Sequence, residues 1–310
     1  MTEWLKRKCP LCFSSEIVPG SEVSAPFIAD ELTFNEVSEF WRGFRKDSCF
    51  FTYSRCAKCG LLYCPRYFTD EQLSILYSSM GDNSAGVSES VLERTQSGYF
   101  KKLVDYGFNS GGDYLELGPD TGLLTKHFAS GGTAAMTLIE PNFEVRDDLL
   151  LSASDCDSVE ILDSLSQISE KQIFDTIAGI HVYDHLVWLE RELLRVNELA
   201  AGDARLLIVV HDEKSLLSKV LRRKWPPYCL QHPQLFNSDT ISKALELAGF
   251  TDIQVYKSTN WFPIKHLGKM VTSLLGMPSS WTHKLPSREI PLRLGNLIVV
   301  ARKPAASHSS

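Results

Sequence analysis

Strand-like and helix-like hydrophobic patterns alternate along the chain from residue 99 to residue 301, and this alternation constrains the fold more than any other feature. Such alternation is typical of βαβ units, which build a mainly parallel sheet with right-handed crossovers. The sequence therefore predicts an α/β, Rossmann-like fold. The expected strands are 114–117, 136–140, 159–162, 174–181, 205–211, 252–257 and 296–301, and the expected helices are 99–107, 122–129, 143–151, 186–200 and 237–247.

The chain has 310 residues, more than one hydrophobic core usually organises. A polar, Gly/Ser-rich stretch over residues 78–90 is typical of a linker, and Thr69 before it is a candidate helix N-cap. We therefore expect several units. They are a small module over 1–66, a helix and linker over 67–98, a large domain over 99–302 with a substrate-side insertion at about 222–236, and a tail over 303–310.

Composition and charge exclude several classes of protein. No apolar run approaches the ~20 residues of a membrane span, and no apolar segment follows the first basic residues as in a secretory signal. We therefore expect a cytoplasmic protein without a membrane partner. The net charge of -6, with nine Lys/Arg against eight Asp/Glu in residues 1–66, argues against nucleic acid as a partner. The sequence predicts no oligomeric state.

Six of the eight cysteines lie in the first 64 residues, and four of them form two C-x-x-C pairs, Cys9 with Cys12 and Cys56 with Cys59. Four thiolates in a tetrahedral array are a usual ligand set for structural Zn²⁺. The long loop between the pairs adds only roughly 0.8 kcal/mol of closure entropy, against ~10–16 kcal/mol from structural zinc. We predict a zinc site, with unligated thiols or redox pairs as the alternative.

The first expected strand leads into a turn that contains two glycines, Gly118 and Gly122, which would let the backbone approach a ligand closely. The dinucleotide fingerprint is not met, because Asp120 replaces its middle glycine. A carboxylate there would repel a pyrophosphate, but together with Glu116 it suits a cofactor that carries an ammonium and a sulfonium. Glu140 follows Glu116 by 24 positions, about the offset of an acid that binds ribose hydroxyls.

On these motifs, the chain resembles class I S-adenosylmethionine (SAM)-dependent methyltransferases, specifically bacterial enzymes with an N-terminal C-x-x-C…C-x-x-C module, among them sugar C-methyltransferases. The segment 180–185 and Ala248-Gly249-Phe250 extend the resemblance over essentially the whole chain. It implies seven strands with the last one antiparallel. Asp120 departs from it, since many members carry glycine there. The contacts that the resemblance implies are Glu116, Gly118 and Gly122 with methionine, Glu140 with ribose, and Leu162 and Asp163 with adenine.

Candidate residues for the acceptor side follow the central strands, whose carboxyl ends hold the ligands in doubly wound sheets. His181 and His185 are four positions apart but lack the glutamate of H-E-x-x-H, so we do not expect a metal there. We expect His181 to cap its strand or contact the cofactor, and we keep it with Tyr183 and His185 as secondary catalytic candidates. His211 ends the next central strand and lies in the same region.

The segment 223–233 is stiffened by two consecutive prolines and is rich in aromatic residues, as expected of a substrate wall or lid. His232 in this segment is our first candidate for the general base, because an imidazole titrates near neutral pH. Alternatively, Trp225 and Tyr228 only cover the edge of the sheet. Arg222, Arg223 and Lys224 would suit a phosphate, or would form a solvated helix end.

These observations predict a SAM-dependent methyltransferase that acts on carbon or oxygen of a small polar metabolite, such as a nucleotide-linked sugar or a secondary-metabolite intermediate. Three alternatives stay open. One is an RNA or protein methyltransferase with the zinc module as adaptor, which the near-neutral charge of residues 1–66 disfavours. Another is an NAD-linked oxidoreductase, which Asp120 disfavours. The last is a non-catalytic binding module.

Overall fold

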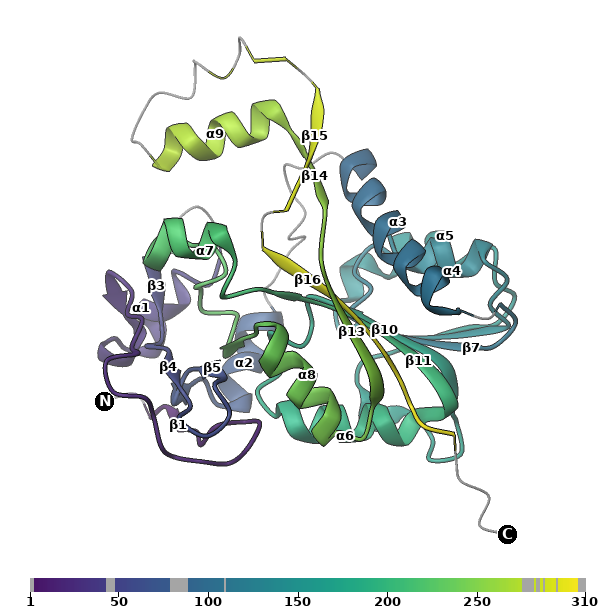
Figure 1. The fold of residues 1–310 in the computed structure, drawn as a ribbon, viewed down its shortest axis with the longest axis horizontal. Helices are drawn as coiled ribbons and strands as arrows, with labels where there is room; N and C mark the ends of the chain where they lie inside the picture. Colours follow the sequence, from purple (N-terminus) through teal and green to yellow (C-terminus); the bar gives the residue numbers. More distant parts are fainter. Residues whose placement is uncertain are drawn as a thin grey trace.

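The structure is a computed structural model that describes residues 3–42, 48–78, 89–108, 110–274, 282, 285–286, 288–293 and 295–305. Most of the expected linker at 78–90 and most of the expected tail lie outside these residues. A large sheet with helices on both faces carries a smaller N-terminal unit at one end (Figure 1). None of the helices in the described part of the chain is long and apolar enough to cross a membrane.

The large sheet has seven strands in the order β13-β16-β11-β10-β7-β8-β9. β16 is antiparallel to both of its neighbours, whereas the five strands from β11 to β9 are mutually parallel. This confirms the predicted fold class. The bounds are β7 Asp113–Leu117, β8 Ala135–Ile139, β9 Val159–Leu162, β10 Phe174–Ile180, β11 Ala200–His211, β13 Thr251–Lys257 and β16 Asn296–Arg302.

Both faces of the sheet are buried, because consecutive strand residues point to opposite sides and both sets are apolar. In β11, Leu206 and Ile208 enter one core, and Leu207 and Val209 enter the other. Helices cover each face (Figure 1). On one side lie α3 Glu89–Tyr106, α4 Thr125–Ser130 and α5 Arg146–Ser152 after the 3₁₀ turn η3 Phe143–Val145, and on the other lie α6 Leu189–Leu199 and α8 Ser238–Leu247.

Helix α3 begins ten residues before the expected start at residue 99. The additional helical turns before residue 99 are stabilised by contacts with a segment that is remote in the sequence. Arg94 stacks over the ring of Trp261, and the Thr95 hydroxyl accepts a hydrogen bond from the Trp261 backbone N–H. Trp261 belongs to β14 Asn260–Pro263, which pairs with β15 Glu289–Leu292 and leads into α9 Ile264–Leu274. This arm was not expected from the sequence.

The N-terminal unit is built from short strands and helices. Its helix α2 begins after Thr69, whose hydroxyl accepts a hydrogen bond from the Gln72 backbone N–H at 3.3 Å, while the Gln72 side chain accepts from Thr69 N–H. Thr69 is therefore the N-cap, as predicted. The elements are β1 Leu5–Lys6, β2 Phe27–Ile28, η1 Ala29–Glu31, α1 Phe34–Ser38, β3 Cys49–Phe50, β4 Ser54–Arg55, β5 Leu62–Tyr63, β6 Arg66–Tyr67 and α2 Asp70–Ser78.

The insertion after β11 packs into the N-terminal unit. It comprises α7 Leu216–Leu221, η5 Arg222–Lys224 and β12 Gln234–Leu235, and β12 pairs with β5. Trp225 and Tyr228 are buried in the aromatic core of that unit, where Tyr228 stacks on Phe50. The partly buried guanidinium of Arg7 donates to the carbonyl oxygens of Val187 and Pro233 and to the side chain of Gln234. Two distant segments of the chain thus form one core.

Candidate cofactor and acceptor site

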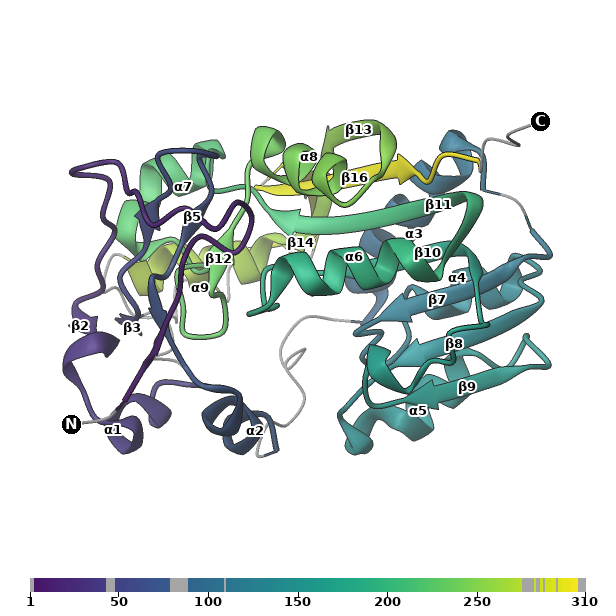
Figure 2. The same cartoon turned by 90° about the horizontal axis from the view of Figure 1, so that it is seen from below.

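The carboxyl ends of the parallel strands point toward the N-terminal unit. Figure 2 shows the arrowheads of β7, β8, β9 and β11 directed to the side on which that unit lies. Loops at this edge of an open α/β sheet form its usual ligand site. The residues predicted for the cofactor and for the acceptor follow these strand ends.

The loop after β7 has no room for side chains at its two glycines. Gly118 and Gly122 have φ of 61° and 83°, a region that favours glycine. A Cβ on Gly118 would lie 2.7 Å from Val182 Cγ2, and one on Gly122 would lie 2.5 Å from Ser152 Cβ. Asp120 also has positive φ, at 53°. Asp is among the residues that tolerate this region best, which explains how it replaces the family's glycine.

Glu116 lies buried beneath the loop. One carboxylate oxygen accepts hydrogen bonds from the hydroxyls of Tyr114 at 2.9 Å and Thr125 at 2.7 Å. Burial raises the pKa of Glu116 to about 7, and the two hydroxyl donors oppose that rise. The side chain therefore ties β7 to the first helical turn of α4, under the loop that would carry the methionine part of SAM.

Glu140 connects the ends of β7 and β8. Its two oxygens accept hydrogen bonds from the backbone N–H groups of Asp120 at 3.0 Å and Asn142 at 2.8 Å. Burial raises the pKa of this carboxyl group as well. A carboxylate oxygen can accept more than one hydrogen bond, so both oxygens retain capacity for ribose hydroxyls beside the glycine loop.

The two residues implied for adenine, Leu162 and Asp163, end β9 and follow it. Asp163 forms an ion pair with Arg146, which also donates to the Glu140 carbonyl oxygen at 2.6 Å. The Arg146 guanidinium lies 4.0 Å from the ring centroid of the exposed Phe143. Arg146 and Phe143 were not expected at the site from the sequence, although both follow Glu140 within six positions.

Glu140→Ala is expected to weaken SAM binding by ~1.5–3 kcal/mol, the contribution of hydrogen bonds to a charged group. The residue lies at a strand end, so the fold should survive. Calorimetric titration with SAM measures the loss, with the exposed neighbour Glu144→Ala as the control that should bind normally. Unchanged affinity in Glu140→Ala would remove this residue from the ribose site.

Four histidine rings gather on the acceptor side of the cofactor loop. His211 lies centrally, with its ring centroid 4.4 Å from that of His181 and 5.1 Å from that of His232. His185 contacts His232 at 4.6 Å. Burial lowers the pKa of His181 to about 4 and that of His211 to about 3, which keeps both imidazoles neutral. The structure thus brings three predicted catalytic candidates together with His211.

The tautomer of His232 follows from its surroundings. Its Nδ1 lies 2.7 Å from the carbonyl oxygen of Pro227. A carbonyl oxygen can only accept, so Nδ1 carries the hydrogen and Nε2 is the basic nitrogen. The carbonyl oxygen of His232 itself accepts a hydrogen bond from the buried Tyr53 hydroxyl at 2.6 Å. The N-terminal unit therefore holds the loop that presents His232.

Tyr183 does not join the histidines. Its ring is wholly buried in the core on the α6 side of the sheet, and a Cβ on Gly179 would lie 2.8 Å from its Cε2. Tyr183 is therefore a core residue and not a candidate base. Tyr77 in α2, which was not among the expected site residues, lies near the histidines instead, with its hydroxyl 3.4 Å from His185 Nδ1.

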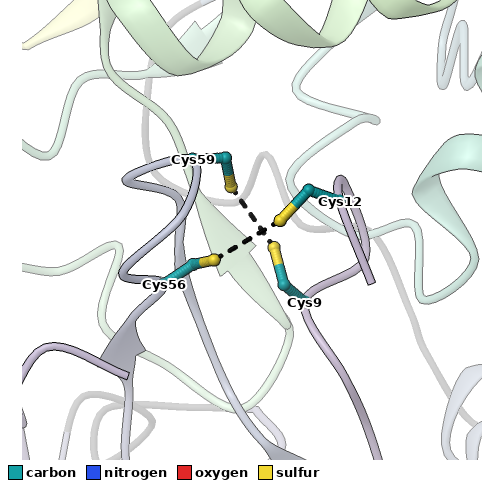
Figure 3. Close-up of side chains that lie close together, drawn as sticks. All are labelled: Cys9, Cys12, Cys56 and Cys59. Atoms are coloured by element: carbon teal, nitrogen blue, oxygen red, sulfur yellow. Dashed lines mark hydrogen bonds between the residues drawn. The ribbon is translucent and has the colours of Figure 1, made fainter. Parts of the chain in front are cut away.

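The four cysteines of the two C-x-x-C pairs form a compact cluster (Figure 3). The sulfur atoms of Cys9 and Cys59 are 3.4 Å apart, and those of Cys12 and Cys56 are 3.5 Å apart. A tetrahedral zinc with Zn–S bonds of 2.3 Å requires about 3.8 Å between sulfurs, so the cluster fits this ion after a small expansion. Hydrogen bonding to Cys9 lowers the pKa of Cys59, which favours a thiolate. The cluster packs in the same core as α8.

The sheet order, the single antiparallel strand and the glycine loop define a class I SAM-dependent methyltransferase domain. Residues 91–255 match the family model described as a methyltransferase domain. The match spans more than half of the chain, which therefore belongs to that family. No curated protein sequence is significantly similar to it.

Solved methyltransferase structures share the fold at low sequence identity. The N-methyltransferase NodS from Bradyrhizobium japonicum WM9, in complex with S-adenosyl-L-homocysteine, is 12% identical with a TM-score of 0.50, over 75% of this chain and 97% of that chain. A second match is a chain of the complex between the Haloferax volcanii Trm112 methyltransferase activator and a methyltransferase. It is 11% identical with a TM-score of 0.51, over 70% of this chain and 93% of that chain.

Proposed function

We propose that this protein transfers the methyl group of SAM to a carbon or oxygen of a small polar metabolite, with a nucleotide-linked sugar or a secondary-metabolite intermediate as the acceptor. The observation that carries the proposal is the histidine cluster of His181, His185, His211 and His232, which lies at the strand ends beside the cofactor loop. The insertion after β11 contributes His232 to this cluster and packs against the N-terminal unit. A site enclosed in this way suits a small molecule better than a macromolecule.

The residues of the cofactor loop suit a cationic methyl donor. SAM supplies a methyl carbon on a positively charged sulfur, which makes that carbon electrophilic. Gly118 and Gly122 let the backbone approach it, and Glu140 would receive the ribose hydroxyls. The carboxylate of Asp120 favours the positive charge of the donor, whereas Glu116 acts from beneath the loop by holding β7 to α4.

On the acceptor side, His232 would remove the proton that the acceptor loses. Its hydrogen bond to Pro227 orients the ring and leaves Nε2 as the proton-accepting nitrogen. Methyl transfer depends mainly on alignment of nucleophile, methyl carbon and sulfur, and a base is needed only when the acceptor must be deprotonated. Carbon or hydroxyl acceptors have that requirement.

The exposed segment η5 supports a phosphate-bearing acceptor. Arg222, Arg223 and Lys224 are consecutive and exposed, and they line a surface hollow together with Ser24 and Tyr228. Guanidinium and ammonium groups bind phosphates through charge-assisted hydrogen bonds. A nucleotide-linked acceptor could place its phosphates there.

The proposal is tested with SAM that carries a labelled methyl group. The full-length protein is incubated with nucleotide-linked sugars, the same sugars without the nucleotide, other small metabolites, bulk RNA and protein. We expect label only in small-molecule products, with the nucleotide-linked forms preferred. Label in RNA or protein instead would establish the adaptor alternative, and SAM binding without turnover on any acceptor would favour a binding module.

A further inference from the structure

A continuous run of polar contacts joins four side chains where β10, β11 and β16 meet. Asn296 lies directly opposite His211 in the β11–β16 pair. Its Oδ1 is 3.1 Å from His211 Nδ1, and its Nδ2 is 3.2 Å from His181 Nε2. On the far side of the His181 ring, Nδ1 faces Asp184 Oδ2 at 3.9 Å. One amide therefore bridges two stacked imidazoles, and one imidazole faces a carboxylate.

The chemistry of the amide gives this run a direction. Nδ2 of asparagine can only donate and Oδ1 can only accept. His181 Nε2 therefore accepts, which places the ring hydrogen of the neutral imidazole on Nδ1, facing Asp184. His211 Nδ1 donates to Oδ1, which leaves the lone pair of His211 on Nε2. The reverse amide orientation would turn a nitrogen lone pair of His181 toward the Asp184 carboxylate, an unfavourable contact.

The carboxylate of Asp184, at one end of this series of contacts, is buried without a cation among the described residues. The residue is wholly buried, and its Oδ2 accepts a hydrogen bond from the His211 backbone N–H at 3.1 Å. Within the described residues, its Oδ1 and His181 Nδ1 have no hydrogen-bond partner, and neither lysine nor arginine pairs with the carboxylate. Burying a carboxylate without a cation is costly, so the N–H that His181 turns toward it has an electrostatic role. His181 also has a φ of 55°, a left-handed conformation that few residues other than glycine adopt and that clusters at functional sites.

We propose that Asp184, His181 and Asn296 are positioning residues that fix the tautomer of His211, so that His211 Nε2 accepts a hydrogen bond from the methyl acceptor. The part of this proposal that concerns the acceptor rests on the proposed function, whereas the tautomer does not. The run thus complements His232, whose own tautomer is fixed separately by Pro227.

A divalent cation is the rival explanation for this cluster. His181, Asp184 and His211 offer ligand atoms that all lie within 4.8 Å of one another. A site with two histidine ligands needs a lone pair from each imidazole. Asn296 bonds to both rings, and only one of them, His211, then has a lone pair that points away from the amide. The hydrogen bonds therefore favour the fixed tautomers over a metal site.

The direct test is NMR of the ¹⁵N-labelled full-length protein, in which long-range ¹H–¹⁵N spectra show which ring nitrogen carries hydrogen. The signals of the two rings are assigned from the variants His181→Gln and His211→Gln, because each variant lacks the signals of one ring. We expect hydrogen on Nδ1 of both. Asn296→Asp should keep this state of His211, because a carboxylate still accepts from Nδ1–H, whereas Asn296→Ala should let His211 exchange between tautomers. Asn35→Ala, on the exposed face of α1, is the matched control and should change neither ring.

A kinetic measurement supplies the second readout. Asn296→Ala is expected to raise the KM for the acceptor about 3- to 10-fold, the loss of one hydrogen bond, with the dissociation constant of SAM within about twofold. Asn296→Asp should restore most of that loss. Hydrogen on His211 Nε2 in the unaltered protein would overturn the proposal. A titration with Mn²⁺ or Zn²⁺ in which one ion per chain, beyond the zinc held by the cysteines, shifts the signals of both rings would overturn it as well. The predicted tautomers without any turnover would count against the proposed function alone.

Discussion

His232→Ala is expected to lower turnover by ~10²–10⁴-fold, the usual contribution of a positioned general base, while the dissociation constant of SAM stays within a few-fold. The imidazole is buried beside His185 and His211, with its Nδ1–H held by Pro227. It belongs to the insertion, whereas the residues assigned to SAM follow β7, β8 and β9. Initial-rate kinetics and calorimetry on the same preparations separate the two effects.

The matched control is His127→Ala, because this histidine stacks on Phe100 on the α3 side of the sheet, away from the cluster. It should keep normal kinetics. A loss in His232→Ala that is confined to the KM of the acceptor would make His232 a substrate-positioning residue. Kinetics identical to those of the unaltered protein would leave it as a structural histidine beside Pro233.

Cys56→Ser is expected to abolish stoichiometric zinc binding and to unfold the N-terminal unit at temperatures that the unaltered protein tolerates. We propose one zinc per chain, held by Cys9, Cys12, Cys56 and Cys59, whose sulfurs already form a cluster of suitable size. Structural zinc contributes ~10–16 kcal/mol in small peptides, far more than the net stability of a small unit. Metal analysis of protein purified without added chelator and a thermal melt measure both effects.

The loss of zinc should also lower turnover, because the N-terminal unit holds the insertion. Tyr53 and Tyr67 donate hydrogen bonds to the carbonyl oxygens of His232 and Leu230, each at 2.6 Å. Cys156→Ser is the control, since Cys156 is buried in the sheet domain and should keep zinc, stability and activity. Full zinc content and unchanged melting of Cys56→Ser would contradict the assignment.

The central strands could be predicted from their hydrophobicity, because strands buried on both faces are continuous apolar runs. The expected strand at 159–162 coincides with β9 Val159–Leu162, and the other expected strands agree at their centres. The start of α3 could not be predicted in this way. Its first turns lie in a polar stretch and contact Trp261, so a tertiary contact decides the boundary.

The glycine turn after β7 could be predicted from the sequence because its residues are local to one βα turn, whereas its role in binding the cofactor stays a prediction. The acceptor side could not. Tyr77 reaches His185 from 108 positions away, and Asn296 reaches His181 from 115 positions away, so no local pattern signals either contact. The sequence did indicate His232, but the hydrogen bond that Tyr53 donates to it comes from 179 positions away, which only the folded chain brings together.

The central claim is that the loop from Glu116 to Gly122, together with Glu140, binds SAM. Calorimetric titration of the full-length protein with SAM and, separately, with NAD tests it most directly, because Asp120 lies where a pyrophosphate would need a glycine. We predict saturable binding of SAM that Glu140→Ala weakens, and no binding of NAD. Binding of NAD together with no binding of SAM would contradict the account.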